Sequence, residues 1–335
     1  MAEGPAILVI GPSWVGDMVM AQCLFSALKK RFPDHAIDVV APGWAAPLLG
    51  RMPEVRARID ASFKRREAGL ADRWRIGRSL RGRYERAYVM PGSWKSALVP
   101  FFAGVRYRTG YLREMRYGLL NEIVPMPAAL KRKTAQGFFG LAGGGHFKAP
   151  RLSVDKGNQT RLLGGHSLQP GKFAAFMPGA EFGPAKRWPS EHYAGLAREL
   201  MARGIAVALF GSPNDKAVTA EIAGLAPGVV DLAGKTRLED AIDLIAAARI
   251  AVSNDSGLMH VAAAVGTPVV AIYGSTSPEN TPPLAELREL VWLHLDCSPC
   301  HQKTCPLGHL NCLKTLEVGR VLAAVDRLLA AQAAA

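Results

Sequence analysis

The segment SNDSGLMH, residues 253–260, combines residue types that bind phosphate with residues that titrate. Asp255 and Ser256 follow an apolar run, Gly257 allows close approach of the backbone, and His260 comes one helical turn later. Backbone N–H groups at the start of a helix bind phosphate because the helix dipole is positive there. The segment therefore predicts a phosphate-binding turn, although His260 by itself is also compatible with a buried core histidine.

A second segment that suits phosphate is GAEFGPAKRWPSEHY, residues 179–193. Gly179 ends an apolar run, and Lys186 and Arg187 are adjacent in the loop that follows. Hydrogen bonds from cations to phosphate oxygens are among the strong polar contacts, so this pair suits a diphosphate. Two solvated surface cations are the alternative.

The segment GPSWVGDMVM, residues 11–20, is close to a nucleotide-binding turn but does not match one. It lacks the Gly-Lys-Ser/Thr of a P-loop, and the spacing of Gly11, Ser13 and Gly16 only approximates the dinucleotide fingerprint. Asp17 would repel an anion, which favours a general base over a phosphate ligand. The alternative is a plain strand-to-helix turn, with Asp17 stabilised by the helix dipole.

Four of the five cysteines cluster near the C-terminus, in CSPCHQKTCPLGHLNC: Cys297, Cys300, Cys305 and Cys312. A Cys-x-x-Cys pair is a good half-site for tetrahedral zinc, but the other two cysteines have a less usual spacing. The cluster is compatible with structural zinc, with reduced structural thiols, or with a disulfide or redox switch. The sequence has no Asp-x-Asp signature for a metal–nucleotide complex, so we expect no catalytic metal.

The net charge of +13 belongs entirely to the first half of the chain. Residues 1–150 contain 24 Lys and Arg against 11 Asp and Glu, whereas residues 151–335 contain 17 of each. A basic surface of this kind suits nucleic acid, anionic lipid headgroups or a phosphorylated glycolipid, unless it is only a solvated face. Nucleic acid is not expected, because no zinc-finger, RNP-like or helix-turn-helix signature is present.

These residues must be positioned by strands and helices that alternate along the chain. We expect strands at 6–11, 36–41, 86–91, 249–255 and 267–274, a strand that enters a glycine turn at 173–179, and a strand and loop at 205–213. Helices are expected at 17–31, 190–204, 239–248 and 257–266. Such alternation predicts an α/β protein with parallel sheets. The polar stretch 150–172 would link two Rossmann-like domains. Ligands bind at the carboxyl ends of the strands in such sheets, where the segments above would converge.

Membrane-spanning and secretory segments are not expected. No run of 18 apolar residues occurs, and the N-terminus has no basic region followed by a cleavable apolar stretch. The sequence predicts a cytoplasmic protein.

Several segments together resemble the heptosyltransferases of glycosyltransferase family 9. They are GDMVMAQCLFSALKKRFP, RTGYLREMRYGLLN, MPGAEFGPAKRWPSEHY, SNDSGLMHVAAAVGTPVVAIYGSTSPENTPP and the CSPC…CPLGH…C tail. The resemblance runs from about residue 6 to residue 325. The second segment and the cysteine tail point more narrowly to type II members of the family.

The resemblance implies a GT-B fold, in which two Rossmann-like domains with parallel sheets face each other across a cleft. Residues 1–165 would bind the acceptor and residues 166–335 the donor, ADP-heptose. The implied reaction is inverting, metal-independent transfer of L-glycero-D-manno-heptose to the first heptose of the lipopolysaccharide inner core, Hep-Kdo2-lipid A. The basic first half would meet this anionic acceptor and attach the enzyme peripherally to the cytoplasmic face of the inner membrane.

The resemblance also implies roles for individual residues. Asp17 would be the base and Lys186 the phosphate-binding lysine. The donor loop would consist of Asp255, Ser256, Gly257 and His260. Ser212 and Thr236 match less closely, as neighbours of the adenosine.

Three rival functions remain open. A sister heptosyltransferase, type I or III, would use a different core acceptor. A nucleotide-dependent oxidoreductase would use Gly11–Gly16, but the imperfect fingerprint weakens this alternative. A non-catalytic protein that binds anionic glycolipid is the third.

Overall fold

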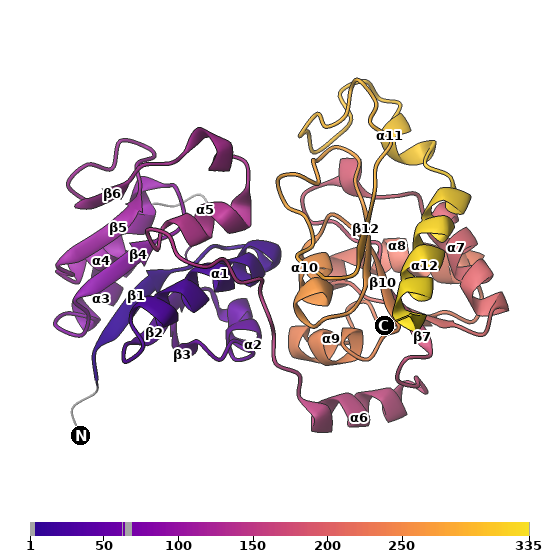
Figure 1. Ribbon diagram of the computed structural model, residues 1–335, viewed down its shortest axis with the longest axis horizontal. Helices are drawn as coiled ribbons and strands as arrows, with labels where there is room; N and C mark the ends of the chain where they lie inside the picture. The colour runs from indigo at the N-terminus through magenta and orange to yellow at the C-terminus, as the bar shows by residue number, and fades with distance from the viewer. Residues whose placement is uncertain (1–3, 62, 64–68, 335) are drawn as a thin grey trace. The chain divides into compact units, whose positions relative to one another are not determined.

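The computed structural model describes residues 4–61, 63 and 69–334 of the chain. It divides into two compact units, Met1–Pro150 and Arg151–Ala335 (Figure 1). Each unit is built around its own six-stranded sheet. The prediction of an α/β protein with two Rossmann-like domains is therefore confirmed.

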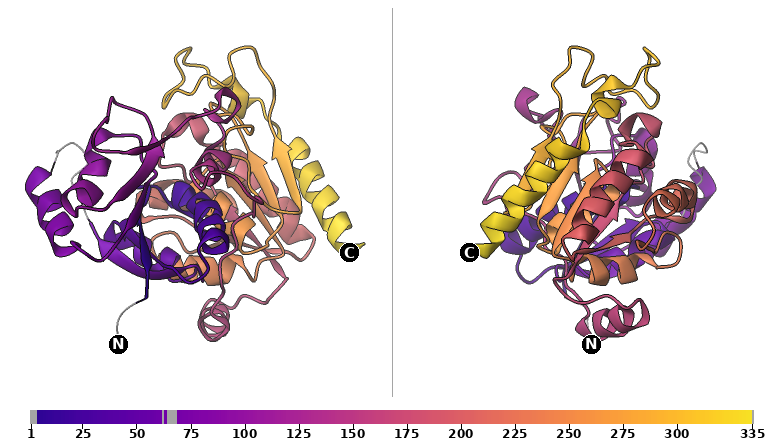
Figure 2. Two further views of the ribbon diagram at one scale, coloured as in Figure 1. Left: turned by 60° about the vertical axis from the view of Figure 1, so that its left-hand side comes forward. Right: turned by 90° about the vertical axis from the view of Figure 1, so that its right-hand side faces the viewer.

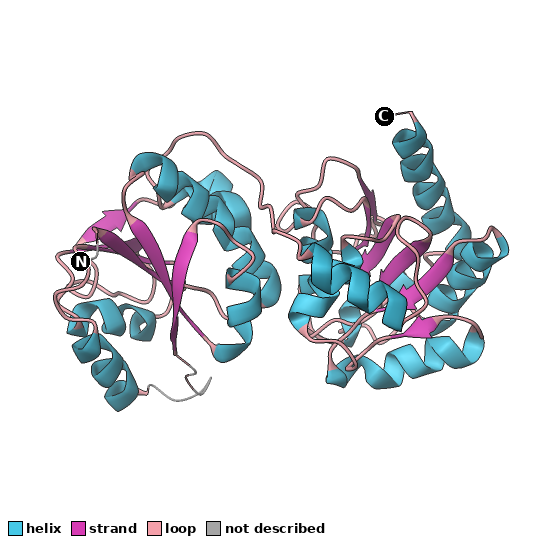
Figure 3. Ribbon diagram, turned by 90° about the horizontal axis from the view of Figure 1, so that it is seen from below, coloured by secondary structure: helices cyan, strands magenta, loops and turns pink. Residues whose placement is uncertain are grey.

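The first unit contains a fully parallel sheet with the strand order β3-β2-β1-β4-β5-β6. Its strands are β1 (Ala6–Ile10), β2 (Ala36–Ala41), β3 (Val55–Asp60), β4 (Arg86–Val89), β5 (Tyr107–Tyr111) and β6 (Glu122–Val124). Its helices are α1 (Val15–Arg31), α2 (Ala46–Leu49), α3 (Leu70–Ser79), α4 (Leu98–Phe102) and α5 (Thr134–Gly140). Helices α1 and α5 pack together, as do α3 and α4, and the sheet lies between the two pairs (Figure 3).

The second unit repeats this topology with the strand order β12-β11-β10-β7-β8-β9. Its strands are β7 (Phe173–Met177), β8 (Ala206–Leu209), β9 (Val230–Asp231), β10 (Ile250–Asn254), β11 (Val269–Ile272) and β12 (Arg288–Val291). Its helices are α6 (Lys156–Gly165), α7 (Ser190–Ala202), α8 (Lys216–Leu225), α9 (Leu238–Ile245), α10 (Gly257–Ala264), α11 (Asn311–Lys314) and α12 (Val318–Ala333). The C-terminal helix α12 packs against α7 and strands β10 to β12 (Figure 2).

The central strands explain the apolar runs of the sequence. Every residue of β1 (AILVI) and of β7 (FAAFM) is buried, because helices cover both faces of a doubly wound parallel sheet. Among the described residues, no helix combines the length and apolar composition needed to cross a bilayer.

The division between the units falls after Pro150, earlier than the boundary after residue 165 that the sequence suggested. The polar stretch contains α6, whose N-cap Asp155 accepts a hydrogen bond from the Asn158 amide. Helix α6 packs on α9, where the Gln159 side chain donates to the Asp243 carbonyl at 2.7 Å. Polar contacts thus attach this stretch to the second unit.

Candidate active site

In the second unit, the candidate site lies where the strand order reverses. Strands β7 and β10 are neighbours in the sheet, but the chain continues from β7 to β8 on one side and from β10 to β11 on the other. Open α/β sheets bind ligands at the carboxyl ends of strands at such a point. The two segments predicted to bind phosphate follow β7 and β10, so both reach this edge.

The structure joins these two segments through an ion pair. Lys186 ends a short 3-10 turn, Pro184–Lys186, and its Nζ lies 2.6 Å from Oδ2 of Asp255. The side chains are only 13% and 6% exposed. Thr276, which follows β11, donates from Oγ1 to the same carboxylate oxygen at 2.7 Å. Three loops therefore meet at one buried carboxylate.

Asn254 fixes the geometry of this site and was not singled out from the sequence. Its side-chain oxygen accepts hydrogen bonds from the Trp188 amide and the Tyr193 hydroxyl, both at 3.1 Å. Its side-chain nitrogen donates to the Pro178 carbonyl at 2.6 Å. A fully buried amide with three partners holds the loop after β7 against the end of β10. The signal in the sequence was an asparagine at the end of an apolar strand.

Helix α10 begins at the site, as the sequence predicted. Ser256 is the N-cap in extended conformation, Gly257 is the first helical residue, and the Oγ of Ser256 lies 3.1 Å from that of Ser253. His260 is buried, and burial lowers its pKa to about 4, although the charge of Asp255 acts in the opposite direction. The imidazole is therefore neutral at pH 7 and can exchange hydrogen bonds but carries no charge.

Arg187, the second cation of this loop, forms a hydrogen bond within the loop itself. Its Nη2 donates to the Ala180 carbonyl of its own loop at 3.3 Å. Its Nε is buried and has no hydrogen-bond partner among the described residues. An unpaired buried donor is costly, and a ligand oxygen could satisfy it.

Gly179, Ser212 and Thr236 lie at the same sheet edge, in loops after β7, β8 and β9. Ser212 forms a capping box with Asp215, and a Cβ on Gly179 would overlap the Asp215 carboxylate. The loop that carries Thr236 is tied to the loop after β8 through the Gly234 amide, which donates to the Gly211 carbonyl at 2.9 Å. These residues therefore line the β8–β9 side of the strand reversal.

In the first unit, Asp17 lies in the first turn of α1, directly after β1. Strands β1 and β4 are the neighbours at which this sheet reverses its order. Gly11 lets the turn pack closely, because a Cβ there would lie 2.9 Å from Cε of Met18 and 3.1 Å from Cγ1 of Val39. A partly exposed carboxylate thus lies at the carboxyl end of β1, the edge at which open α/β sheets commonly bind ligands.

The five cysteines are free thiols. In the tail, burial and, to a smaller extent, the charges of Cys297, Cys300 and Cys305 raise the pKa of Cys312 to about 11. Backbone N–H donors, led by that of Leu310, lower the pKa of Cys305. The four thiols are thus near enough to interact electrostatically. Within the described ranges, however, no three His, Cys, Asp or Glu residues are arranged to hold a metal ion.

Comparison with known proteins supports the resemblance seen in the sequence. The family model for glycosyltransferase family 9 (heptosyltransferase) matches residues 73–311. The chain is 42% identical over 341 residues to lipopolysaccharide heptosyltransferase 2 of Escherichia coli (strain K12), covering 96% of this chain and 98% of the relative. It is 45% identical over 305 residues to lipooligosaccharide heptosyltransferase 2 of Haemophilus influenzae, covering 86% and 88%.

A solved structure agrees with these sequence matches. The structure of E. coli ADP-heptose lps heptosyltransferase II superposes with a TM-score of 0.87 at 42% identity, covering 98% of this chain and 99% of that chain. The fold is therefore of the GT-B type, and the chain belongs to glycosyltransferase family 9, the heptosyltransferases.

Proposed function

We propose that this protein transfers L-glycero-D-manno-heptose from ADP-heptose to the first heptose of the lipopolysaccharide inner core, Hep-Kdo2-lipid A. The observation that carries the proposal is the identity of 42% to a type 2 enzyme across 96% of the chain. The matched family segment includes Lys186 and Asp255, the buried pair at the strand reversal of the second sheet.

The second unit would bind the donor. Lys186 and the first turn of α10, at Ser256 and Gly257, suit the diphosphate, because cations and helix N-termini both stabilise anionic oxygens. The unpaired Nε of Arg187 would donate to the same group. His260, being neutral, would serve as a hydrogen-bonding group.

The loops after β7, β8 and β9 would bind the nucleoside part of the donor. Gly179, Ser212 and Thr236 lie in these loops, on the β8–β9 side of the strand reversal. The diphosphate and the Asp255 carboxylate are both anionic, so they would compete for the Lys186 ammonium group. Binding of the donor would therefore draw Lys186 from Asp255 toward the diphosphate.

The first unit would bind the acceptor and supply the base. Asp17 would take the proton of the acceptor hydroxyl as its oxygen attacks the anomeric carbon of the donor. Attack on the face opposite ADP breaks the bond to the β-phosphate oxygen and inverts the configuration. Lys186, Arg187 and the α10 N-terminus would stabilise the charge that develops on departing ADP, so this scheme requires no metal.

Two further features belong to the proposal. The surplus of cations in residues 1–150 would attach the enzyme peripherally to anionic lipid on the cytoplasmic face of the inner membrane. Structural zinc in the cysteine tail remains a hypothesis that elemental analysis of the purified protein decides.

A transfer assay tests the proposed function directly. Purified enzyme and ADP-heptose are incubated with acceptors truncated just before and just after the first heptose. We expect product only from the acceptor that carries this heptose. Product from the shorter acceptor would instead indicate a type I enzyme. Thermal stabilisation by NAD but not by ADP would favour an oxidoreductase and overturn the proposal.

A further inference from the structure

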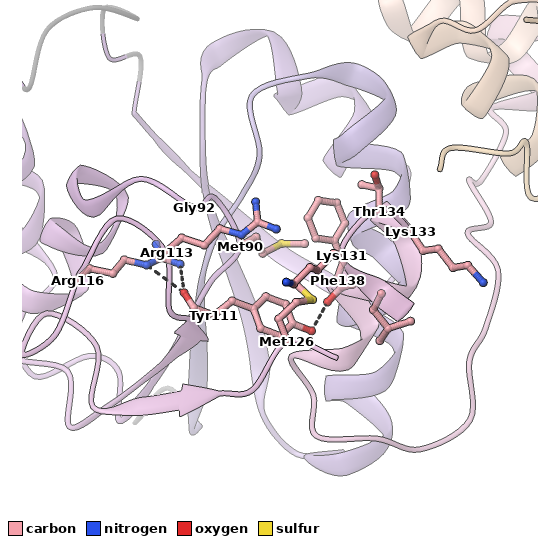
Figure 4. A pocket seen from close by; sticks show the side chains of 12 residues that line it. Met90, Gly92, Tyr111, Arg113, Arg116, Met126, Lys131, Lys133, Thr134 and Phe138 are labelled. Atoms are coloured by element: carbon pink, nitrogen blue, oxygen red, sulfur yellow. Dashed lines mark hydrogen bonds between the residues drawn. The ribbon is translucent and has the colours of Figure 1, made fainter. Parts of the chain in front are cut away.

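The first unit contains a pocket of about 190 Å³ that the roles assigned above do not use (Figure 4). It opens at the carboxyl ends of β4 and β5, and its wall includes Met90, Gly92, Tyr111, Arg113, Lys131 and Phe138. No described Asp or Glu lines it. The pocket therefore combines apolar walls with cations that no carboxylate within it neutralises.

Arg116 builds one wall of the pocket rather than offering its charge to a ligand. It is 2% exposed, and its guanidinium donates to the carbonyls of Tyr111, at 2.7 and 3.2 Å, and of Pro91, at 2.6 Å. These bonds attach the loop after β5 to the loop after β4. The Glu114 carboxylate adds a second link by accepting from the Trp94 amide at 2.9 Å. The pocket wall is therefore fixed before any ligand binds.

Arg113 and Lys131 remain available to a ligand. The stem of Arg113 lies across Gly92, where an added Cβ would come within 2.8 Å of the Arg113 Cδ. Both side chains are exposed, and neither forms an ion pair with another residue of the described ranges. Their charged ends lie on the same side of the pocket, whereas Lys133 points away from them (Figure 4).

We propose that this pocket binds one anionic oxygen group of the acceptor, a phosphate or a carboxylate, through Arg113 and Lys131. Arginine suits such groups because its planar fork can donate two parallel hydrogen bonds. The volume is below the roughly 300–1,000 Å³ typical of sites for drug-sized ligands, so it fits one charged group and the adjoining part of a sugar. The inference rests on the proposed function, since it identifies a contact within the acceptor site.

The topology places this pocket on the same sheet edge as Asp17. Strand β4 is next to β1, and β5 is one strand further along. Two strand spacings amount to about 10 Å, so the pocket would hold a group some distance from the hydroxyl that attacks the donor. The pocket would therefore position the acceptor rather than take part in the chemistry.

Charge-removing variants test the proposal, with a neighbouring cation as the control. Arg113→Gln and Lys131→Gln each remove one pocket cation, while Arg132→Gln removes an exposed cation that does not line the pocket. We expect the pocket variants to raise the KM for the acceptor about tenfold, as for the loss of one charge-assisted hydrogen bond. The KM for ADP-heptose, and kcat at saturating acceptor, should remain those of the wild type. Arg132→Gln should leave all three constants unchanged.

The source of the anion is distinguished by repeating the assay with acceptor treated with phosphatase. If the pocket binds phosphate, Arg113→Gln and the wild type should have the same KM for the treated acceptor. If it binds a carboxylate, the tenfold difference persists.

The proposal is wrong if the pocket variants behave like Arg132→Gln while the wild type transfers heptose. Failure of the wild type to transfer would instead contradict the proposed function. Calorimetric titration of deacylated acceptor into the wild type and the variants then tests the pocket without turnover. Equal affinities would overturn the proposal.

Discussion

At the scale of single residues, the contact between Lys186 and Asp255 determines how substitutions at either position must be interpreted. Both side chains are almost buried, and removing one partner of such a pair leaves the other charge without compensation. A loss of activity in a Lys186 variant could therefore have two causes, the loss of a phosphate ligand and the destabilisation of the loop. The two effects must be separated before Lys186 is assigned to the donor.

A pair of variants separates these effects. Lys186→Met should lower the free energy of unfolding by about 3 kcal/mol, because Asp255 remains buried and charged. Adding Asp255→Asn should restore most of that stability but not the affinity for ADP. Urea unfolding and ADP titration measure the two quantities. ADP affinity like that of the wild type in the double variant would exclude Lys186 as a phosphate ligand.

Asp17→Asn tests the proposed base. The amide has nearly the same shape but cannot accept the acceptor proton, so kcat should fall by about 10²–10⁴. ADP binding should be unchanged, because a base acts on the acceptor. Asp34→Asn, an exposed carboxylate after α1, is the matched control and should keep full activity. A loss of ADP affinity in Asp17→Asn would identify the carboxylate as a donor ligand instead.

His260 predicts a dependence of stability on pH. Its pKa in the folded protein is about 4, against an ordinary value of 6.5. Below pH 6.5 the unfolded chain binds a proton that the folded protein does not, so stability falls as the pH drops from about 6.5 to 4. The loss approaches about 3 kcal/mol, at 1.36 kcal/mol for each pKa unit.

The measurement is the unfolding free energy of the wild type and of His260→Gln across this pH range. The variant should be less stable at neutral pH but should show a shallower decline on acidification. If the unfolding free energies of the two proteins changed in parallel with pH, His260 would have the same pKa in the folded and the unfolded state.

At the scale of elements, the loops after β7 and β8 depend on a glycine for their close approach. Gly179 faces Asp215, whose carboxylate accepts from the backbone and the hydroxyl of Ser212 at 2.9 and 2.8 Å. A methyl group at residue 179 must therefore displace the cap that shapes the loop after β8. Contact between two loops thus explains the glycine at residue 179. The sequence around this residue does not reveal that contact.

Gly179→Ala should consequently cost about 1–2 kcal/mol of stability, the range for a lost cap or an overfilled contact. ADP affinity should fall with it if this loop borders the nucleoside. Gly164→Ala is the control, because a Cβ at that position of α6 meets open space. It should leave ADP affinity unchanged. Full stability in Gly179→Ala would show that Asp215 moves without cost.

At the scale of the whole molecule, the net charge is distributed unequally between the two structural units. All of the net charge of +13 belongs to residues 1–150, although the two sheets share one topology. Lysine and arginine are dense between residues 51 and 86, and residues 62 and 64–68 of this stretch lie outside the described residues. This distribution of charge predicts that the first unit attaches the protein electrostatically to anionic lipid.

The full chain should therefore sediment with vesicles that contain anionic lipid at about 0.1 M salt and be released at about 1 M, where the screening length is about 3 Å. Vesicles of zwitterionic lipid alone serve as the control and should not bind it. Binding that persists at high salt would show that apolar contacts, not charge, hold the protein to the membrane.

The sequence by itself determined the class of fold and the segments that reach the ligand-binding edge. Fully buried parallel strands must be apolar throughout, which makes runs such as AILVI and FAAFM recognisable. Strand β3 (VRARID) was not predicted, because its side chains are partly exposed at the edge of the sheet. Helix α6 was not predicted, since its polar, glycine-rich sequence is stabilised by contacts with α9.

Only the tertiary structure decided which of the predicted residues meet. Lys186 and Asp255 are 69 residues apart, and they form a pair because β7 and β10 are neighbours in the sheet. Arg113 and Lys131 likewise share a pocket because they follow β5 and β6, which are neighbours in the first sheet. Strand order and buried polar contacts act between distant segments, so the local periodicity of the sequence does not contain them.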